Sequence, residues 1–219
     1  MNFKAAIFDM DGTLIDSLIL WEVLWAEFGE KFLGNKKFMP SKTDDKAVRT
    51  LPLDKAMDLI HKNYKMAESS QELLDTANEI MIDFYKNTVK TKAGVKEFLE
   101  DCRKKGIRMC IASATAPDLI KIAAEHCGLT QYFEKIFSCA DIGKGKESPD
   151  IFLKACEYFG TKPEETCVFE DSLVAIETAT KIGMPTVGIY DRNNFGQDRI
   201  KELATVYIAN GETLSKIIL

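Results

Sequence analysis

Short apolar runs alternate with helical patterns along most of this chain. Six runs have the length and composition of buried strands: Ala5–Asp9, Ile107–Ser113, Glu134–Cys139, Cys167–Glu170, Pro185–Ile189 and Ala204–Ile208. Between most of them, apolar residues recur at steps of three and four, which predicts the helices Val95–Lys105, Pro117–Cys127, Pro149–Phe159 and Leu173–Ile182. Strands that alternate with helices in this way favour a parallel sheet whose two faces are both covered by helices.

Proline and glycine mark the ends of these predicted helices. Pro117 and Pro149 suit a first helical turn, where a missing N–H leaves no helical bond unmade. A glycine follows each helical pattern, at the position where a helix often ends in the left-handed conformation: Gly106, Gly128, Gly160 and Gly183.

The chain from residue 16 to residue 91 lacks this alternation. Its apolar spacing predicts helices with no strand between them: Ser17–Phe32, Lys46–Tyr64 with a turn at Pro52, and Ser70–Lys86. The simplest interpretation is a helical insertion after the first strand. We therefore predict a core of residues 1–15 and 92–219 and a helical cap of residues 16–91.

The first polar cluster follows the first predicted strand, as Asp9-Met10-Asp11-Gly12-Thr13. Two carboxylates two residues apart can take different roles, one as a nucleophile and the other as an acid or base. The glycine permits a sharp turn and lets a backbone N–H approach an anion. The alternative is a solvated acidic turn, because Asp and Gly are common turn residues.

Three further polar clusters stand at the carboxyl ends of predicted strands. Ser113-Ala114-Thr115 can bind a phosphate with the help of helix N–H groups, or it can cap a helix. Lys146, just ahead of a helix, can hold a phosphate, or it can be a surface lysine. Glu170-Asp171 offers oxygen ligands that suit magnesium, or it caps a helix. Because ligands bind at this edge of a parallel sheet, all four clusters can converge on one site.

Four motifs resemble those of the haloacid dehalogenase superfamily in type and order: DMDGT (9–13), SAT (113–115), KGKESPDIF (144–152) and FEDS (169–172). The resemblance extends from Ala5 to about Ile208. The helical insertion is similar to the cap of the branch that holds phosphoglycolate phosphatases, sugar-phosphate phosphatases and β-phosphoglucomutases. The resemblance implies an α/β fold, with a Rossmann-like doubly wound parallel sheet as the core and an inserted α-helical cap domain.

This resemblance also implies a hydrolase of small phosphate monoesters that works through an aspartyl phosphate. Asp9 would attack the phosphorus, and Asp11 would protonate the leaving oxygen and later activate water. Lys146 and the Ser113 hydroxyl would neutralise and orient the phosphoryl group. The second aspartate of the DMDGT motif favours phosphoryl transfer over dehalogenation.

A Mg²⁺ cofactor and a substrate pocket are further implications of the resemblance. The metal ligands would be the Asp9 carboxylate, the Asp11 backbone carbonyl and Asp171, with Glu170 either a direct ligand or one layer behind. The residues expected to bind the phosphate or the rest of the substrate are Gly12, Thr13, Ala114 and Trp21. The cap is expected to close over the substrate and exclude bulk water.

Three positions depart from the pattern of the family. Trp21 stands where the sugar phosphomutases have a histidine, and Ala116-Pro117 stands where they have a lysine. Both departures favour a hydrolase. The alternative is a sugar phosphomutase of the β-phosphoglucomutase type, and a non-catalytic protein that binds a phosphate ligand is a third possibility. Ala175 replaces a glycine that usually follows the FEDS motif, which narrows the helix packing without abolishing metal binding.

Aromatic residues recur at helical spacing in the first helix of the predicted cap, at Trp21, Trp25, Phe28 and Phe32. A stripe that holds the cap helices together is the favoured interpretation. The alternative is that Trp21 shapes the pocket for the leaving group. Three basic residues of the cap are either surface charges or contacts to a second anionic group of the substrate: Lys42, Lys46 and Arg49.

Composition limits the partners of this chain. Its net charge of −5 does not favour nucleic-acid binding, which needs a basic face. No apolar run has the length to cross a bilayer, and the first eight residues show no signal peptide. Six scattered cysteines predict reduced thiols in a cytoplasmic protein. The expected partner is a small phosphorylated metabolite, bound by a monomer or a weak homodimer.

Overall fold

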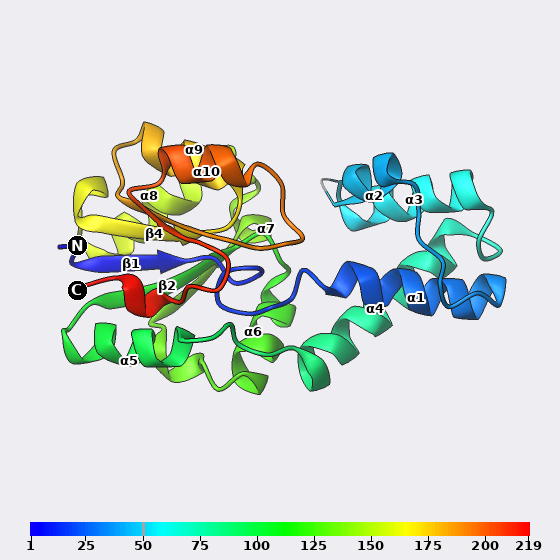
Figure 1. The fold of residues 1–219 in the computed structure, drawn as a ribbon, viewed down its shortest axis with the longest axis horizontal. Helices are drawn as coiled ribbons and strands as arrows, with labels where there is room; N and C mark the ends of the chain where they lie inside the picture. Colours follow the sequence, from blue (N-terminus) through cyan, green and yellow to red (C-terminus); the bar gives the residue numbers. More distant parts are fainter. Residues whose placement is uncertain (50) are drawn as a thin grey trace. The chain divides into compact units, whose positions relative to one another are not determined.

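The computed structural model describes residues 1–49 and 51–219, which divide into two compact units. Residues 1–18 and 89–219 form the sheet unit, and residues 19–88 form the helical unit. The N- and C-termini both lie in the sheet unit (Figure 1). Across the described residues, no helix combines the length and the apolarity that crossing a membrane requires. The assignment of residues 16–91 as a cap domain stays a prediction.

Six parallel strands form the sheet, in the order β3-β2-β1-β4-β5-β6. Their bounds are β1 (Ala5–Phe8), β2 (Arg108–Ser113), β3 (Lys135–Ser138), β4 (Thr166–Glu170), β5 (Thr186–Ile189) and β6 (Val206–Ile208). All residues of the central strands β1 and β4 are buried, as expected of strands covered on both faces. The predicted doubly wound α/β fold is confirmed.

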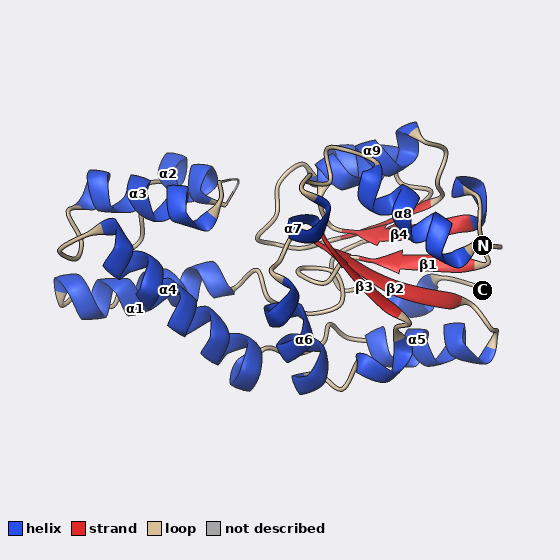
Figure 2. Ribbon diagram, turned by 180° about the vertical axis from the view of Figure 1, so that it is seen from behind, coloured by secondary structure: helices blue, strands red, loops and turns tan. Residues whose placement is uncertain are grey.

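Helices cover the two faces of this sheet (Figures 1 and 2). On one face lie α8 (Asp150–Phe159) and α9 (Leu173–Lys181), whose apolar residues form one core with Ile7 of β1 and Val168 of β4. On the other face, Phe98 of α5 (Val95–Lys104) meets a stack of Phe8 and Phe169, whose ring centroids are 4.3 Å apart. The remaining α-helices of the unit are α6 (Pro117–His126), α7 (Cys139–Ile142) and α10 (Gln197–Leu203).

Aromatic packing holds the helical unit together. Its elements are α1 (Leu20–Leu33), α2 (Lys42–Val48), α3 (Leu53–Tyr64), α4 (Ser70–Asp83) and a π-helical turn over Phe84–Thr88. Trp25 and Phe28 of α1 are completely buried and pack in one cluster with Met57 and Ile60 of α3. The Trp25 indole N–H donates to an Asp45 carboxylate oxygen at 2.8 Å, so the polar edge of the ring is satisfied inside the unit.

Three local expectations differ from the structure. The helix predicted from Lys46 begins earlier, because α2 starts at Lys42, where the Ser41 hydroxyl accepts the N–H of Asp44 at 3.1 Å. Pro52, where a turn was predicted, caps the separate helix α3, and residue 50 of the predicted range lies outside the described residues. Lys146 does not directly follow a strand: β3 ends at Ser138, and the short helix α7 intervenes. Pro149 is the cap residue of α8 and precedes its first turn.

Candidate active site

Two acidic residues lie at the centre of the carboxyl edge of the sheet, because they directly follow the adjacent strands β1 and β4. Phe8 pairs with Phe169, and the N–H of Asp9 continues this ladder by donating to the Phe169 carbonyl at 2.9 Å. Asp171 comes immediately after β4. The sheet reverses its winding direction between these two strands, and open α/β sheets bind ligands at that position.

Asp9 forms an ion pair with Lys146, although the two residues are 137 positions apart in the sequence. The Lys146 ammonium also donates to an oxygen of Glu170. The Lys146 side chain is only 10% exposed and that of Asp9 only 9%. The lysine therefore brings a buried positive charge between two carboxylates that follow β1 and end β4.

Asp171 is fixed by a hydrogen bond to each of its carboxylate oxygens. The Thr13 hydroxyl donates to Oδ1 at 3.0 Å, and the Asn194 amide donates to Oδ2 at 2.6 Å. Gly12 lies so close that a Cβ atom at this position would be 2.3 Å from Oδ2 of Asp171, and its φ is +76°. A glycine is required here because both the left-handed backbone and the close carboxylate exclude a side chain.

Glu170 uses its second oxygen to hold the start of the chain after β4. Oε2 accepts the N–H of Asp171 at 3.1 Å and the N–H of Ser172 at 3.0 Å. Its first oxygen accepts from Lys146. Both oxygens of Glu170 therefore accept hydrogen bonds, and these bonds orient the Lys146 ammonium and the backbone of Asp171.

Asp11 has more solvent around it than Asp9, and two hydroxyl groups hold it. The Ser17 hydroxyl donates to Oδ1 and the Thr115 hydroxyl donates to Oδ2, each at 2.7 Å. The N–H of Thr115 donates to the Ser113 hydroxyl oxygen at 3.1 Å, and the Ser138 hydroxyl donates to the Thr115 carbonyl at 2.9 Å. The ends of β2 and β3 thus position the second aspartate of the DMDGT motif.

Burial dominates the electrostatics of this cluster. It raises the pKa of Asp9 well above its ordinary value, although the Lys146 ammonium opposes the shift. It also raises the pKa of Asp171 to about 7, with the charge of Glu170 adding to the effect. Burial alone would lower the pKa of Lys146, but Asp9 and Glu170 raise it, so this lysine is protonated.

The donor set fits a divalent cation with a preference for oxygen. Asp9, Glu170 and Asp171 each offer a carboxylate oxygen, and these oxygens lie within 4.8 Å of one another. Among the described residues, the ion pairs of this group come from Lys146 alone. When all three carboxylates are ionised, one ammonium leaves two negative charges uncompensated, which Mg²⁺ would neutralise through ligands of the type it prefers.

The other predicted binding residues fall in three different settings. Gly12 and Thr13 are buried beside Asp171, where the Thr13 hydroxyl contacts that carboxylate. Ala114 is exposed, next to the buried Ser113. Trp21 lies on α1 of the helical unit, packed on Trp25 with a ring-centroid distance of 5.7 Å. Its role in substrate binding stays a prediction.

Asn194 and Ser17 are the contacts that sequence reasoning missed. Asn194 lies in the loop after β5, where a polar stretch with no periodicity gives no sign of a partner 23 residues earlier. Ser17 lies six residues after Asp11, in the turn where the chain leaves the sheet unit. The signal available in the sequence was a serine six residues after the second aspartate of the acidic motif.

Comparison with known proteins places the chain in a family. The profile of the haloacid dehalogenase-like hydrolase family matches residues 6–189. A Thermotoga maritima protein named "Phosphorylated carbohydrates phosphatase" is 24% identical over 215 residues, which cover 97% of each chain. A Drosophila melanogaster protein named "Probable pseudouridine-5'-phosphatase" is 29% identical over 192 residues, 84% of this chain and 80% of its own. A Thermotoga maritima structure, provisionally named beta-phosphoglucomutase, has a TM-score of 0.80 at 23% identity and covers 94% of each chain. The chain belongs to the haloacid dehalogenase-like hydrolase family.

Proposed function

We propose that this enzyme hydrolyses small phosphate monoesters, with Asp9 as the nucleophile and Mg²⁺ as the cofactor. The observation that carries the proposal is the environment of Asp9. One of its carboxylate oxygens contacts the buried Lys146 ammonium, and Asp171 and Glu170 complete an oxygen-rich cluster at the central edge of the sheet. This arrangement supports attack on an electrophile whose negative charge is offset by cations.

The first step transfers the phosphoryl group to Asp9. A carboxylate oxygen of Asp9 forms a bond to phosphorus while the bond between phosphorus and the leaving oxygen breaks. Asp11 gives its proton to that leaving oxygen, which departs as an alcohol. The hydroxyls of Ser17 and Thr115, each 2.7 Å from an oxygen of Asp11, hold this group for the transfer.

The second step regenerates the enzyme. Water attacks the phosphorus of the aspartyl phosphate and gives a proton to Asp11, and the bond between Asp9 and phosphorus breaks. Inorganic phosphate leaves, Asp9 is again a carboxylate and Asp11 is again an acid. Lys146 and the Ser113 hydroxyl orient the phosphoryl group in both steps.

Asp9, Asp171 and the backbone carbonyl of Asp11 would hold the Mg²⁺ ion. When bound, this cation supplies positive charge that offsets the negative charge of the phosphoryl oxygens. Glu170 orients Lys146, because its two oxygens already accept hydrogen bonds from that ammonium and from two backbone N–H groups. Its role as a direct ligand of the metal stays a prediction.

The names of the relatives support a phosphorylated carbohydrate or nucleoside as the substrate class. One relative is named for phosphorylated carbohydrates and another for pseudouridine 5'-phosphate. A sugar phosphomutase is the second candidate, favoured by the name of the Thermotoga maritima structure with the TM-score of 0.80. Release of phosphate from sugar phosphates without a bisphosphate activator would distinguish the hydrolase, whereas interconversion of sugar phosphates without release would establish the mutase.

Asp9→Asn tests the covalent mechanism. Phosphate release from an aryl phosphate in the presence of Mg²⁺ is expected to fall by more than about 10³-fold, because the amide is not a nucleophile. The matched control is Asp118→Asn, since the Asp118 side chain is 94% exposed in the first turn of α6. Equal rates for Asp9→Asn and the wild type would overturn the mechanism.

A further inference from the structure

The loop after β5 reaches Asp171 through a single side chain. Asn194 donates from Nδ2 to Oδ2 of Asp171 at 2.6 Å and to the Asp171 carbonyl at 2.9 Å. The Oδ1 atom of Asn194 accepts the N–H of Phe195 at 2.8 Å, so the amide oxygen faces away from the carboxylate. With Thr13 on the other carboxylate oxygen, Asp171 cannot rotate without losing a hydrogen bond.

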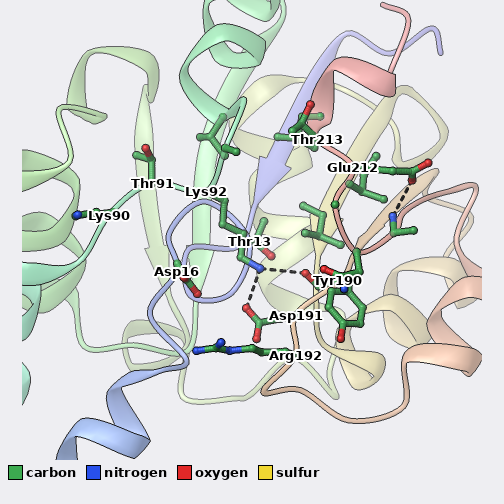
Figure 3. A pocket seen from close by; sticks show the side chains of 18 residues that line it. Thr13, Asp16, Lys90, Thr91, Lys92, Tyr190, Asp191, Arg192, Glu212 and Thr213 are labelled. Carbon is green, nitrogen blue, oxygen red and sulfur yellow. Dashed lines mark hydrogen bonds and ion pairs between the residues drawn. The ribbon is translucent and has the colours of Figure 1, made fainter.

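A buried ion pair holds this loop in place. Asp191 is 3% exposed, and its Oδ2 accepts from the Lys92 ammonium at 2.7 Å. Lys92 also donates to the Tyr190 carbonyl at 3.1 Å, and Figure 3 shows the ammonium between these two residues. The Asp191 carbonyl in turn accepts the N–H of Asn194 at 3.2 Å. The ammonium therefore fixes the part of the loop from which Asn194 extends.

The hydrogen bonds of Lys92 also connect this loop to the segment that follows the DMDGT motif. The backbone N–H of Lys92 donates to the Leu14 carbonyl at 3.0 Å, directly beside Thr13. Thr13 donates to Asp171, Asp171 accepts from Asn194, and Asn194 is tied to Asp191 and Lys92. These bonds form a closed ring, and its members Thr13, Lys92, Tyr190 and Asp191 line a cavity of about 520 Å³ (Figure 3).

We propose that Asn194 is a positioning residue for the metal-binding carboxylate of Asp171, and that the Lys92–Asp191 ion pair holds the loop that presents it. The inference rests on the proposed function, because it takes Asp171 as a ligand of the divalent cation. Groups that orient the ligands of a metal set its affinity, since a carboxylate that must first be immobilised binds more weakly. Asn194 is expected to act on metal affinity and not on the chemical step.

The experiment measures Mn²⁺ and Mg²⁺ affinity of the full chain by calorimetry and, for Mn²⁺, by electron paramagnetic resonance. Asn194→Leu keeps the approximate size of the side chain and removes its donor, whereas Asn194→Ala removes both. Each variant is expected to weaken metal binding on the order of 10- to 100-fold. Activity lost at low Mg²⁺ should return at saturating Mg²⁺, with kcat near that of the wild type, which general damage to the fold would not allow.

Asn210→Leu is the matched control, because Asn210 is exposed and lines the same cavity. Its metal affinity should equal that of the wild type. If Asn194→Leu does not fold, Asn194→Ala decides the result. Lys92→Met is expected to weaken binding in the same direction, because it releases the loop.

Asp171→Asn separates this inference from the function on which it rests. If Asp171→Asn loses metal binding while both Asn194 variants bind within about threefold of the wild type, the positioning role is overturned and the proposed function stands. If Asp171→Asn binds the metal as tightly as the wild type, Asp171 is not a ligand, and the proposed metal site and this inference both fall.

Discussion

The two units of this chain bury very different side chains. Four acidic residues are at least 93% buried in the sheet unit: Asp9, Glu170, Asp171 and Asp191. Among the described residues of the helical unit, the buried polar residue is Thr76, and the core consists of Trp25, Phe28 and aliphatic neighbours. Buried charge is costly, and like charges placed together add to that cost. The buried acidic residues therefore destabilise the sheet unit, whereas the buried side chains of the helical unit stabilise it by apolar packing.

Phe28→Ala tests the packing side of this comparison and carries the largest expected effect. The ring is fully buried and has T-shaped contacts with Trp25 at 6.0 Å and Phe32 at 5.8 Å between centroids. Its removal is expected to lower the free energy of unfolding of the helical unit by about 3–5 kcal/mol. Denaturant titration followed by tryptophan fluorescence measures this, because both tryptophans of the chain, Trp21 and Trp25, are in this unit.

Metal affinity of Phe28→Ala gives the corresponding control. At a temperature where the helical unit remains folded, Mn²⁺ binding should match that of the wild type, since the carboxylate cluster belongs to the sheet unit. A loss of metal affinity in the folded variant would show that the two units are not independent in this respect.

Removal of the metal tests how much the buried carboxylates destabilise the sheet unit. Mg²⁺ at 100 times its dissociation constant is expected to stabilise the folded sheet unit by about 2.7 kcal/mol. The physical reason is neutralisation of Asp9, Glu170 and Asp171, which Lys146 offsets only in part. Thermal unfolding with Mg²⁺ and with a chelator measures the effect, and Asp171→Asn should abolish most of it. Identical transitions under both conditions would contradict the metal site.

The smallest predicted effect, taken per pH unit, is a pH dependence of opposite sign in the two units. In the metal-free sheet unit, burial raises the pKa of Asp171 to about 7. The folded state then binds a proton that the unfolded state releases near pH 4, so stability falls as pH rises from about 4 to 7, by at most about 1.4 kcal/mol per pH unit. In the helical unit, the hydrogen bond from the Tyr64 hydroxyl lowers the pKa of Asp44. Its contribution is present above pH 4 and is lost at lower pH.

Denaturant titrations in a chelator measure both trends, at pH 5, 6 and 7 for the sheet unit and at pH 2, 3 and 4 for the helical unit. Asp171→Asn should make the decline of the sheet unit shallower, and the part that remains comes from Asp9, whose pKa burial also raises. Mg²⁺ should likewise reduce the decline, because it keeps the carboxylates ionised. Asp44→Asn should leave that decline unchanged. It should reduce only the stability that the helical unit loses in acid. A sheet unit that gains stability between pH 5 and 7 without metal would reverse the expected sign.

Much of the fold follows from local patterns in the sequence. The predicted strands overlap β1 to β6. The pattern is clearest for β1 and β4, because runs buried on both faces contain few polar residues. The short helices α7 and α10 were not predicted, since four and seven residues are too few for a periodic pattern to emerge. The start of α2 was missed because a serine cap ahead of Lys42 determines it and the apolar spacing does not.

The candidate site shows where sequence reasoning ends. The DMDGT and FEDS motifs could be placed together, because each follows a strand and parallel strands share an edge. The structure brings Asp9, Lys146 and Asp171 into one cluster, while their roles remain proposals. The contacts of Asn194 and Lys92 could not be anticipated. Each joins two segments that are far apart in the sequence and lie side by side only in the folded sheet.

The backbone bond from Asp9 to Phe169 has a consequence for the lifetime of the site. This N–H is the last rung of the ladder between the two central strands, and beneath it the rings of Phe8 and Phe169 are stacked. Amide hydrogens in such a place exchange with solvent only when the centre of a sheet opens. The backbone of the proposed nucleophile is therefore expected to open together with the central strands, and transient fraying of the surrounding loops would leave it in place.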